Sequence, residues 1–320
     1  QTDGIAASEA IKKLDYFASS ETPFFLAVGF FRPHTPFVAP KEYFDFYDRK
    51  KIEIPEVSNE YLATLPEPAV KSIRAKKNQL NLEKELAQEI KEAYYSTVSF
   101  VDAQVGRILD HLKSLGLDKN TIVVFTSDHG YHLGEHGHWQ KQTLFENSTR
   151  IPLIISSPSI KNKDMKTISP VELIDVYPTL MDLTNLNTPL HVVGKSLVPL
   201  MKDTNASVRE SALTRWRNGY TIKTKRFRLT KWGVNGELGY ELYDHKNDKN
   251  ELINLASNQE YLEVMDTLKV LIDQRIAEAS SKPEGLGRQF ENAKSMYKAK
   301  NVTYGDIHDL NGEIIYFKDK

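Results

Sequence analysis

The sequence lacks cysteine altogether. This absence excludes disulfide bonds, thiolate metal sites and a cysteine nucleophile within these 320 residues. Long hydrophobic runs are lacking too, since none approaches the roughly 20 apolar residues that a membrane-spanning helix needs. No signal peptide is visible, and because the chain starts with Gln1 instead of Met, we expect a processed chain or a fragment.

An excess of charge of either sign is also absent. Lys and Arg total 42, Asp and Glu total 43, and the formal net charge is −1. Without a basic block, the sequence offers no electrostatic basis for binding nucleic acid. The hydrophobic share of 40% is sufficient for a sizeable core, and 320 residues suffice for one large domain or two smaller ones.

Buried strands alternate with amphipathic helices along the first part of the chain. Continuous apolar or β-branched runs predict strands at residues 24–30, 121–127 and 151–156. Apolar residues at steps of three and four predict helices at residues 1–16, 82–115 and 171–186. This alternation favours an α/β fold in which a mostly parallel sheet is flanked by helices.

The pattern changes near residue 205. Short alternating strands are predicted at residues 212–217, 220–224, 227–232 and 241–244, followed by a helix at 261–276. Asn218-Gly219 is typical of a type I′ hairpin turn between the first two of these strands. We therefore expect residues 1–205 to form the main domain and 206–280 a small antiparallel subdomain with a helix. Residues 281–320, with a strand-like run at 313–317, stay unassigned.

Asp128-His129-Gly130 directly follows the strand predicted at 121–127. In open α/β sheets, ligands bind beyond the carboxyl ends of the strands, so a carboxylate and an imidazole there are well placed to bind a metal. A plain strand-to-turn connection is the alternative, and position alone does not decide between the two. His34 lies in a second loop of this kind, beyond the strand predicted at 24–30, with Pro33 and Pro36 beside it.

His129, His132, His136 and His138 fall within ten residues, which is more imidazole than a solvated loop needs. The i, i+4 spacing of His132 and His136 suggests a zinc site, but the interleaved glycines argue against the regular helix that this spacing requires. The alternative is that one or two of them are simply exposed. Lys141 follows and could supply a point charge to a bound oxyanion.

Four segments, in the same order, resemble the sulfatase family, and in particular iduronate-2-sulfatase and its bacterial relatives. They are PFFLAVGFFRPHTPFVAP at residues 23–40, SDHGYHLGEHGHWQKQTLF at 127–145, RIPLII at 150–155 and ELIDVYPTL at 172–180. The resemblance runs from about residue 1 to residue 255. It implies the fold of the alkaline phosphatase superfamily, here incomplete on its N-terminal side.

The resemblance also implies a chemistry. Enzymes of this family cleave sulfate esters with a formylglycine nucleophile made from Cys or Ser, and a calcium ion holds the sulfate. By position in the shared motifs, Asp128 and His129 match two calcium ligands. His34 and Lys141 match side chains that contact the sulfate or assist the leaving group. The implied substrate is a sulfated sugar or glycan, and the implied location is periplasmic or extracellular.

Two departures from the family pattern stand out. The sequence contains no Cys-x-Pro-x-Arg or Ser-x-Pro-x-Arg motif for the nucleophile, and the family's two further aspartate ligands are missing. We therefore expect a fragment, one piece of a split enzyme whose partner is the N-terminal half, or a degenerate homologue. These residues alone are expected to be inactive.

Two other functions compete with the sulfatase interpretation. One is a zinc-dependent phosphohydrolase of the same superfamily, in which Asp-His-Gly also occurs; Lys141 and the Pro-His-x-Pro loop favour the sulfatase. The other is a non-catalytic sugar-binding chain. Residues 244–250, DHKNDKN, superficially suggest a calcium loop, but Lys246 occupies a ligand position and the required glycine is absent. We interpret them as a turn that closes the small sheet.

Overall fold

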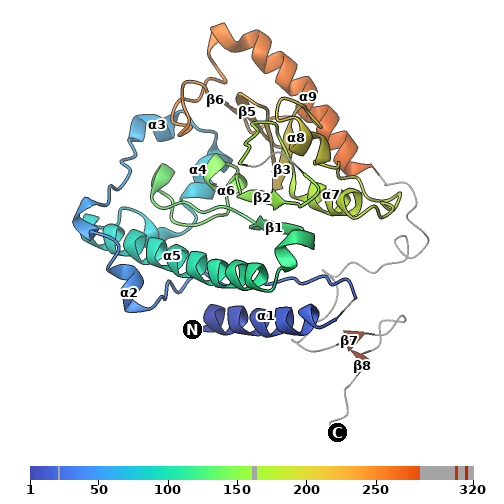
Figure 1. Cartoon of the computed structure of the whole chain (residues 1–320). Coiled ribbons are helices and arrows are strands. Elements are labelled where there is room, and N and C mark those ends of the chain that lie inside the picture. The colour runs from blue at the N-terminus through green and yellow to red at the C-terminus, as the bar shows by residue number, and fades with distance from the viewer. Residues whose placement is uncertain (21, 161–163, 282–306, 309–313, 316–320) are drawn as a thin grey trace. The chain divides into compact units, whose positions relative to one another are not determined.

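The computed structural model describes residues 1–20, 22–160, 164–281, 307–308 and 314–315 (Figure 1). The helices of this part of the chain are α1 (Thr2–Ala18), α2 (Lys41–Phe44), α3 (Asn59–Ala63), α4 (Glu67–Ile73), α5 (Lys84–Ser114), α6 (Glu146–Thr149), α7 (Val176–Leu183), α8 (Val198–Lys202) and α9 (Leu262–Ser280). The strands are β1 (Val123–Thr126), β2 (Leu153–Ser156), β3 (Ala212–Trp216), β4 (Gly219–Lys223), β5 (Phe227–Trp232), β6 (Tyr240–Asp244), β7 (Ile307–His308) and β8 (Ile314–Ile315).

The contacts of the chain fall into two units. The larger unit comprises Gln1–Asn187 and Gly194–Ser280. The smaller comprises Thr188–Val193 and Ser281–Lys320, and in it β7 pairs with β8 in antiparallel orientation. Of the strand-like run predicted at 313–317, residues 314 and 315 form β8, and the others lie outside the described residues. The boundary expected near residue 205 stays a prediction.

The long helix predicted at 82–115 is confirmed as α5, and α1 packs along it (Figure 1). Gly116, with φ of 72°, follows α5 in the left-handed region that glycine adopts without strain. Asp3 of α1 is buried, and its carboxylate accepts hydrogen bonds from the backbone N–H groups of Phe31 and Arg32 at 2.9 and 3.0 Å. The first helix therefore anchors the loop that carries His34.

The strand predicted at 24–30 does not form in the structure. Its residues alternate between half-buried and exposed, and the Phe25 side chain is 83% exposed. A strand needs a hydrogen-bonded neighbour, and the described residues place none beside this segment. The strands predicted at 121–127 and 151–156 do form, as β1 and β2, but they pair with each other in antiparallel orientation, with Val123 opposite Ser156. Among the described residues, the α/β part thus has no parallel strand pair.

The small antiparallel subdomain is confirmed as a four-stranded sheet of order β3-β4-β5-β6. Helix α9 covers one face of it, and the buried residues between them are Ile222, Leu229, Leu242, Met265, Leu268 and Ile272. On the other side, Trp232 and Tyr243 pack with Leu144, Phe145 and the buried residues of α3 and α4. This second cluster joins the sheet to the segment that follows Lys141.

The hairpin between β3 and β4 turns one residue earlier than the sequence predicts. Trp216 lies opposite Gly219, so Arg217-Asn218 forms the two-residue turn, with φ of 51° at Arg217. Gly219 lies in the strand, where a Cβ atom would come within 2.5 Å of the Trp232 ring. The glycine is needed for the close approach of this buried indole and does not supply the turn conformation.

One buried carboxylate makes the stability of this sheet sensitive to pH. Glu241 is 2% exposed and accepts hydrogen bonds from Trp232 Nε1 at 2.6 Å and from the Tyr243 hydroxyl at 2.8 Å. Burial raises the pKa of Glu241 to about 7, against the opposing effect of these two hydrogen bonds. The folded chain therefore holds a proton on Glu241 that the unfolded chain releases at lower pH.

We predict that Glu241→Gln removes this dependence. A raised folded-state pKa stabilises the fold below the unfolded value of 4.5, and this contribution is lost as the pH rises through about 7. The unfolding free energy of the wild type relative to Glu241→Gln should therefore fall between pH 5 and pH 8, by about 1.4 kcal/mol per unit of pKa shift. Denaturant unfolding at the two pH values measures this. The exposed Glu237→Gln is the matched control, and an equal pH response in both variants would contradict the prediction.

Candidate active site

Asp128 and His129 lie side by side just beyond the end of β1. Asp128 Oδ2 is 3.7 Å from His129 Nε2, and the Asp128 side chain is 82% exposed. His129 Nδ1 is 2.8 Å from the Gly130 carbonyl oxygen, so Nδ1 carries the proton that is donated to this oxygen. The Nε2 lone pair is then available, and metal-binding histidines are commonly oriented by such a hydrogen bond. A carboxylate oxygen and an imidazole nitrogen therefore form a pair that can hold one cation.

Gly130 fixes the position of this pair. Its N–H donates to the Ser148 carbonyl at 2.9 Å, which connects the end of β1 to helix α6. A Cβ atom on Gly130 would lie 2.0 Å from the Asn147 carbonyl oxygen and 3.0 Å from that of Arg150. Only glycine allows this backbone approach, so the Asp-His-Gly sequence has a structural requirement at its third position.

His34 is exposed in the loop that Asp3 anchors. Its Nδ1 is 2.7 Å from the Thr35 carbonyl oxygen, which again leaves Nε2 available, and its ring packs 4.8 Å from the Phe31 ring. The Arg32–Pro33 and Thr35–Pro36 peptide bonds on either side of His34 are both cis.

Tyr131 is the point at which the separate segments meet. The ring of Phe37, from the His34 loop, lies 6.1 Å from the Tyr131 ring, and both pack against Tyr94 of α5. The next residue, His132, donates its backbone N–H to the Gln140 carbonyl at 2.8 Å, which places Lys141 beside the same segment. Among the described residues, the Lys141 ammonium makes no ion pair. The four residues singled out in the sequence thus lie on segments that converge, and their roles stay a prediction.

The other three histidines of the cluster lie in the core. His132, His136 and His138 are each at most 2% exposed, and burial lowers the pKa of all three, that of His136 to about 4. They bond to structural partners: His132 to Thr143, His136 to the Tyr61 hydroxyl and His138 to the Ile73 carbonyl. Within the described residues, their nitrogens do not form a group close enough to share a metal. The zinc interpretation of the i, i+4 pair is therefore not supported.

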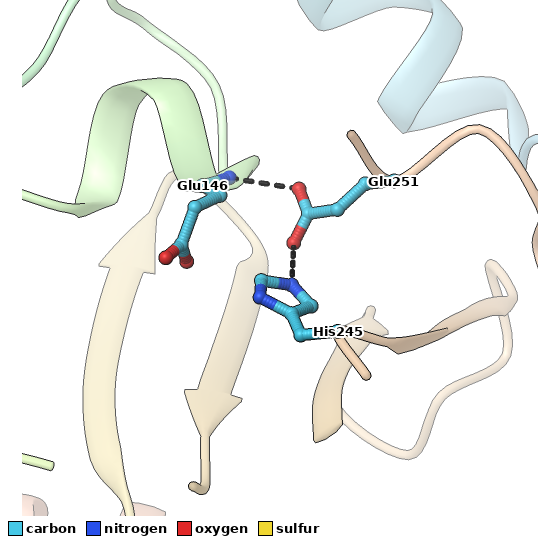
Figure 2. Close-up of side chains that lie close together, drawn as sticks. All are labelled: Glu146, His245 and Glu251. Carbon is cyan, nitrogen blue, oxygen red and sulfur yellow. Dashed lines mark hydrogen bonds and ion pairs between the residues drawn. The ribbon is translucent and has the colours of Figure 1, made fainter. Parts of the chain in front are cut away.

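The structure brings together a polar cluster that the sequence does not reveal. Glu146 of α6, His245 and Glu251 offer ligand atoms that lie within 4.8 Å of one another (Figure 2). Glu251 accepts from the Glu146 backbone N–H at 2.8 Å and pairs with His245 Nε2 at 2.7 Å. Arg228 of β5 forms ion pairs with both carboxylates, so a guanidinium already supplies the positive charge that a metal would bring.

Glu251 is ionised in this cluster. Burial alone would raise its pKa, but Arg228, the His245 hydrogen bond and the Glu146 N–H outweigh burial and lower the pKa of Glu251 to about 2. Glu146 and Glu251 are 105 residues apart in the chain, and no local motif contains both. Sequence patterns could not have identified this cluster.

The turn predicted at 244–250 is confirmed. The Asp244 carbonyl accepts from the N–H groups of Asn247 and Asp248, and the Asp244 carboxylate is bound by Arg226 at 2.6 and 2.7 Å. These contacts occupy the oxygens that a calcium loop would need.

The sequence of this chain matches two family models. The family model described as Sulfatase matches residues 3–186, and the model described as N-sulphoglucosamine sulphohydrolase, C-terminal, matches residues 134–278. A protein named Sulfatase from Formosa agariphila is 36% identical over 259 residues, which cover 78% of this chain and 49% of that protein. Human iduronate 2-sulfatase is 32% identical over 222 residues, which cover 58% of this chain and 40% of that protein.

The chain is also similar to solved structures. The phosphonate monoester hydrolase from Silicibacter pomeroyi superposes with a TM-score of 0.75 at 23% identity, over 86% of this chain and 60% of that protein. At this identity the likeness concerns the fold, and it confirms the α/β fold class. The chain spans half or less of the length of the two relatives named above.

We predict that Gly130→Ala destabilises the fold and displaces the Asp128–His129 pair. The added methyl would overlap the Asn147 carbonyl, and relief of such overpacking typically costs roughly 1–3 kcal/mol. Thermal unfolding measures the loss. Gly106→Ala, in the middle of α5 with no atom within 4 Å of the new Cβ, is the control and should stabilise by about 0.5–1 kcal/mol. Equal unfolding temperatures of the two variants would contradict the prediction.

Proposed function

The chain belongs to the sulfatase family, and we propose that it supplies one part of an active site that hydrolyses sulfate esters of sugars. The observation that carries this proposal is the Asp128–His129 pair beyond β1, with His129 Nε2 free and 3.7 Å from Asp128 Oδ2. Around this pair lie the segments of His34 and Lys141, which contact Tyr131 and His132.

The pair fits a divalent cation, and we propose calcium. Asp128 contributes a hard carboxylate oxygen, and the exposure of its side chain leaves room for water molecules in the remaining positions. A bound cation would neutralise the negative oxygens of the sulfate group.

His34 and Lys141 complete the proposed chemistry on the protein side. When the bond between sulfur and the ester oxygen breaks, negative charge develops on the leaving oxygen. His34, in its protonated form, donates a proton from Nε2 to this oxygen, and the sugar leaves as an alcohol. The Lys141 ammonium, which has no ion pair among the described residues, stabilises the negative charge in the transition state.

The nucleophile is proposed to come from polypeptide outside these 320 residues. The sequence contains no cysteine and no Ser-x-Pro-x-Arg motif from which formylglycine could be made. The relatives named above are about twice as long as the part that this chain matches. An N-terminal half of the same enzyme, on the same or a separate chain, is the partner that this proposal requires.

A sulfated sugar is the proposed substrate class, because the chain is similar to an iduronate sulfatase over 222 residues. Among the described residues, no helix combines the length and the apolar character needed to cross a lipid bilayer. A periplasmic or extracellular location is proposed from the resemblance.

We predict weak calcium binding by these 320 residues. Two protein ligands leave most of the 6–8 positions around calcium to water, so the dissociation constant should be on the order of 10⁻⁴–10⁻³ M. Isothermal calorimetry measures it, with Asp128→Asn expected to abolish the signal. A submicromolar constant would show that further ligands exist and that the two-ligand description is incomplete.

We predict no sulfatase turnover above background by these residues alone, since attack would depend on unactivated water. Addition of the N-terminal half of the enzyme should produce turnover of a chromogenic aryl sulfate and of a sulfated disaccharide. In the complemented enzyme, His34→Ala or Lys141→Ala should lower kcat by about 10²–10³-fold.

Lys113→Ala, at an exposed lysine in the last turn of α5, is the control and should keep full turnover. Robust turnover by the 320 residues alone would overturn the proposed division of the site. Absence of turnover after complementation would favour a chain that only binds.

A further inference from the structure

A polar cleft of about 340 Å³ adjoins the candidate active site. Its walls come from three segments: Tyr131 and Glu135 after Gly130, residues of helix α6 with Arg150 at its end, and the turn at Lys249-Asn250. None of the calcium, sulfate or leaving-group roles discussed above uses these side chains.

The cleft begins next to the Asp128–His129 pair. Gly130 follows the pair directly, and its Cβ position would lie 2.0 Å from the Asn147 carbonyl and 3.0 Å from the Arg150 carbonyl. Neighbouring Cα atoms are about 3.8 Å apart, so the backbone of the wall formed by Asn147 and Arg150 lies close to the backbone of His129. The cleft is therefore near enough for a sugar bound at Asp128 and His129 to enter it.

The cleft lining carries two carboxylates and two cations, so its formal charge is balanced. The carboxylates are engaged by protein groups: Glu146 by the buried Arg228, which also binds Glu251, and Glu135 by the Leu133 N–H at 2.5 Å. In contrast, the Lys249 ammonium makes no ion pair among the described residues, and the Arg150 guanidinium, 79% exposed, comes only within 3.9 Å of Glu146. These two cations are therefore the charged groups of the cleft that remain open to an anionic ligand.

Neutral hydrogen-bonding groups lie between these charges. The side-chain amides of Asn147 and Asn250 line the cleft. Tyr131 stacks on Tyr94 with ring centroids 5.3 Å apart, and its hydroxyl is a hydrogen-bond donor. Amides and hydroxyls beside an aromatic face are the groups that bind sugar hydroxyls.

The buried cluster holds the two walls of the cleft at a fixed distance. Glu146 belongs to α6, and Glu251 follows Asn250 in the opposite wall. The Glu146 N–H binds Glu251 directly (Figure 2), and so does Arg228. Both backbone segments are therefore tied to one buried cluster, whereas the exposed Arg150 and Lys249 side chains can adjust to a ligand.

We infer that this cleft is a subsite for a second anionic group of the sulfated sugar, bound by Arg150 and Lys249. The group is a carboxylate or a further sulfate on the same or the next sugar ring. This inference rests on the proposed function, because it takes the sulfate at Asp128 and His129 as the reference point. The subsite makes the enzyme prefer multiply charged sugars to simple sulfate esters.

The first test is direct binding to the chain. Calorimetric titration uses a sulfated disaccharide with a uronate carboxylate, the same disaccharide with that carboxylate reduced to an alcohol, and a disulfated disaccharide without a carboxylate. Arg150→Ala and Lys249→Ala should each weaken binding of the doubly charged sugars by roughly tenfold, the change expected for one lost charge-assisted contact. The reduced disaccharide and the disulfated one distinguish a carboxylate from a second sulfate as the bound group.

Lys246→Ala is the matched control, because Lys246 is an exposed lysine in the same turn but does not line the cleft. It should bind all three sugars like the wild type. Equal binding of the doubly charged sugars by the wild type, Arg150→Ala and Lys249→Ala would overturn the subsite.

The second test separates this inference from the proposed function. In the complemented enzyme, the ratio of kcat/KM for a doubly charged disaccharide to that for an aryl sulfate should fall roughly tenfold in Arg150→Ala and stay unchanged in Lys246→Ala. Turnover with an unchanged ratio in Arg150→Ala would contradict the subsite alone. Absence of aryl sulfate turnover in the wild type would contradict the proposed function, and the binding measurements would then decide on the subsite.

Discussion

The buried ion pairs of Arg228 are the interaction on which the described structure depends most. This guanidinium, 1% exposed, binds Glu146 at the start of α6 and Glu251 after the four-stranded sheet. Removing one partner from such a group leaves a buried charge uncompensated, which costs several kcal/mol. One guanidinium faces two carboxylates, and the hydrogen bonds from His245 and the Glu146 N–H offset the excess negative charge. The cluster therefore connects the active-site segment to the C-terminal sheet only when all four side chains are in place.

Next to this connection, the segment between Gly130 and Arg150 packs around buried side chains. His132, His136 and His138 fill it as neutral, hydrogen-bonded core residues, and Phe145 stacks on His136 with ring centroids 4.0 Å apart. In the sequence this histidine-rich loop suggests a zinc site, but in the structure these three histidines belong to the packed core. Its rigid interior leaves Asp128, His129 and Lys141 on the outside, where they can meet a ligand.

The part of the site that the sequence predicts best is the part built from short motifs. Asp128 and His129 directly follow β1, and His34 and Lys141 lie in short motifs, so a local pattern is enough to single out all four as candidates. The strand predicted at residues 24–30 does not form, because a strand depends on more than local sequence. Its apolar residues fit a buried strand, but strand formation depends on hydrogen bonds to a neighbour, and the described residues supply none.

The sequence by itself determined the long helices α1, α5 and α9, the four-stranded sheet and the choice of candidate ligands, because each depends on periodicity or on residues that are close in the chain. It could not determine the antiparallel pairing of β1 with β2, the burial of three histidines or the turn at Arg217-Asn218. It also contained no sign of the Arg228 cluster or of the cleft between α6 and Lys249. Only the tertiary structure decided these features. Each of them either joins residues that are far apart in the chain or depends on what packs against a residue, and neither can be inferred from local sequence.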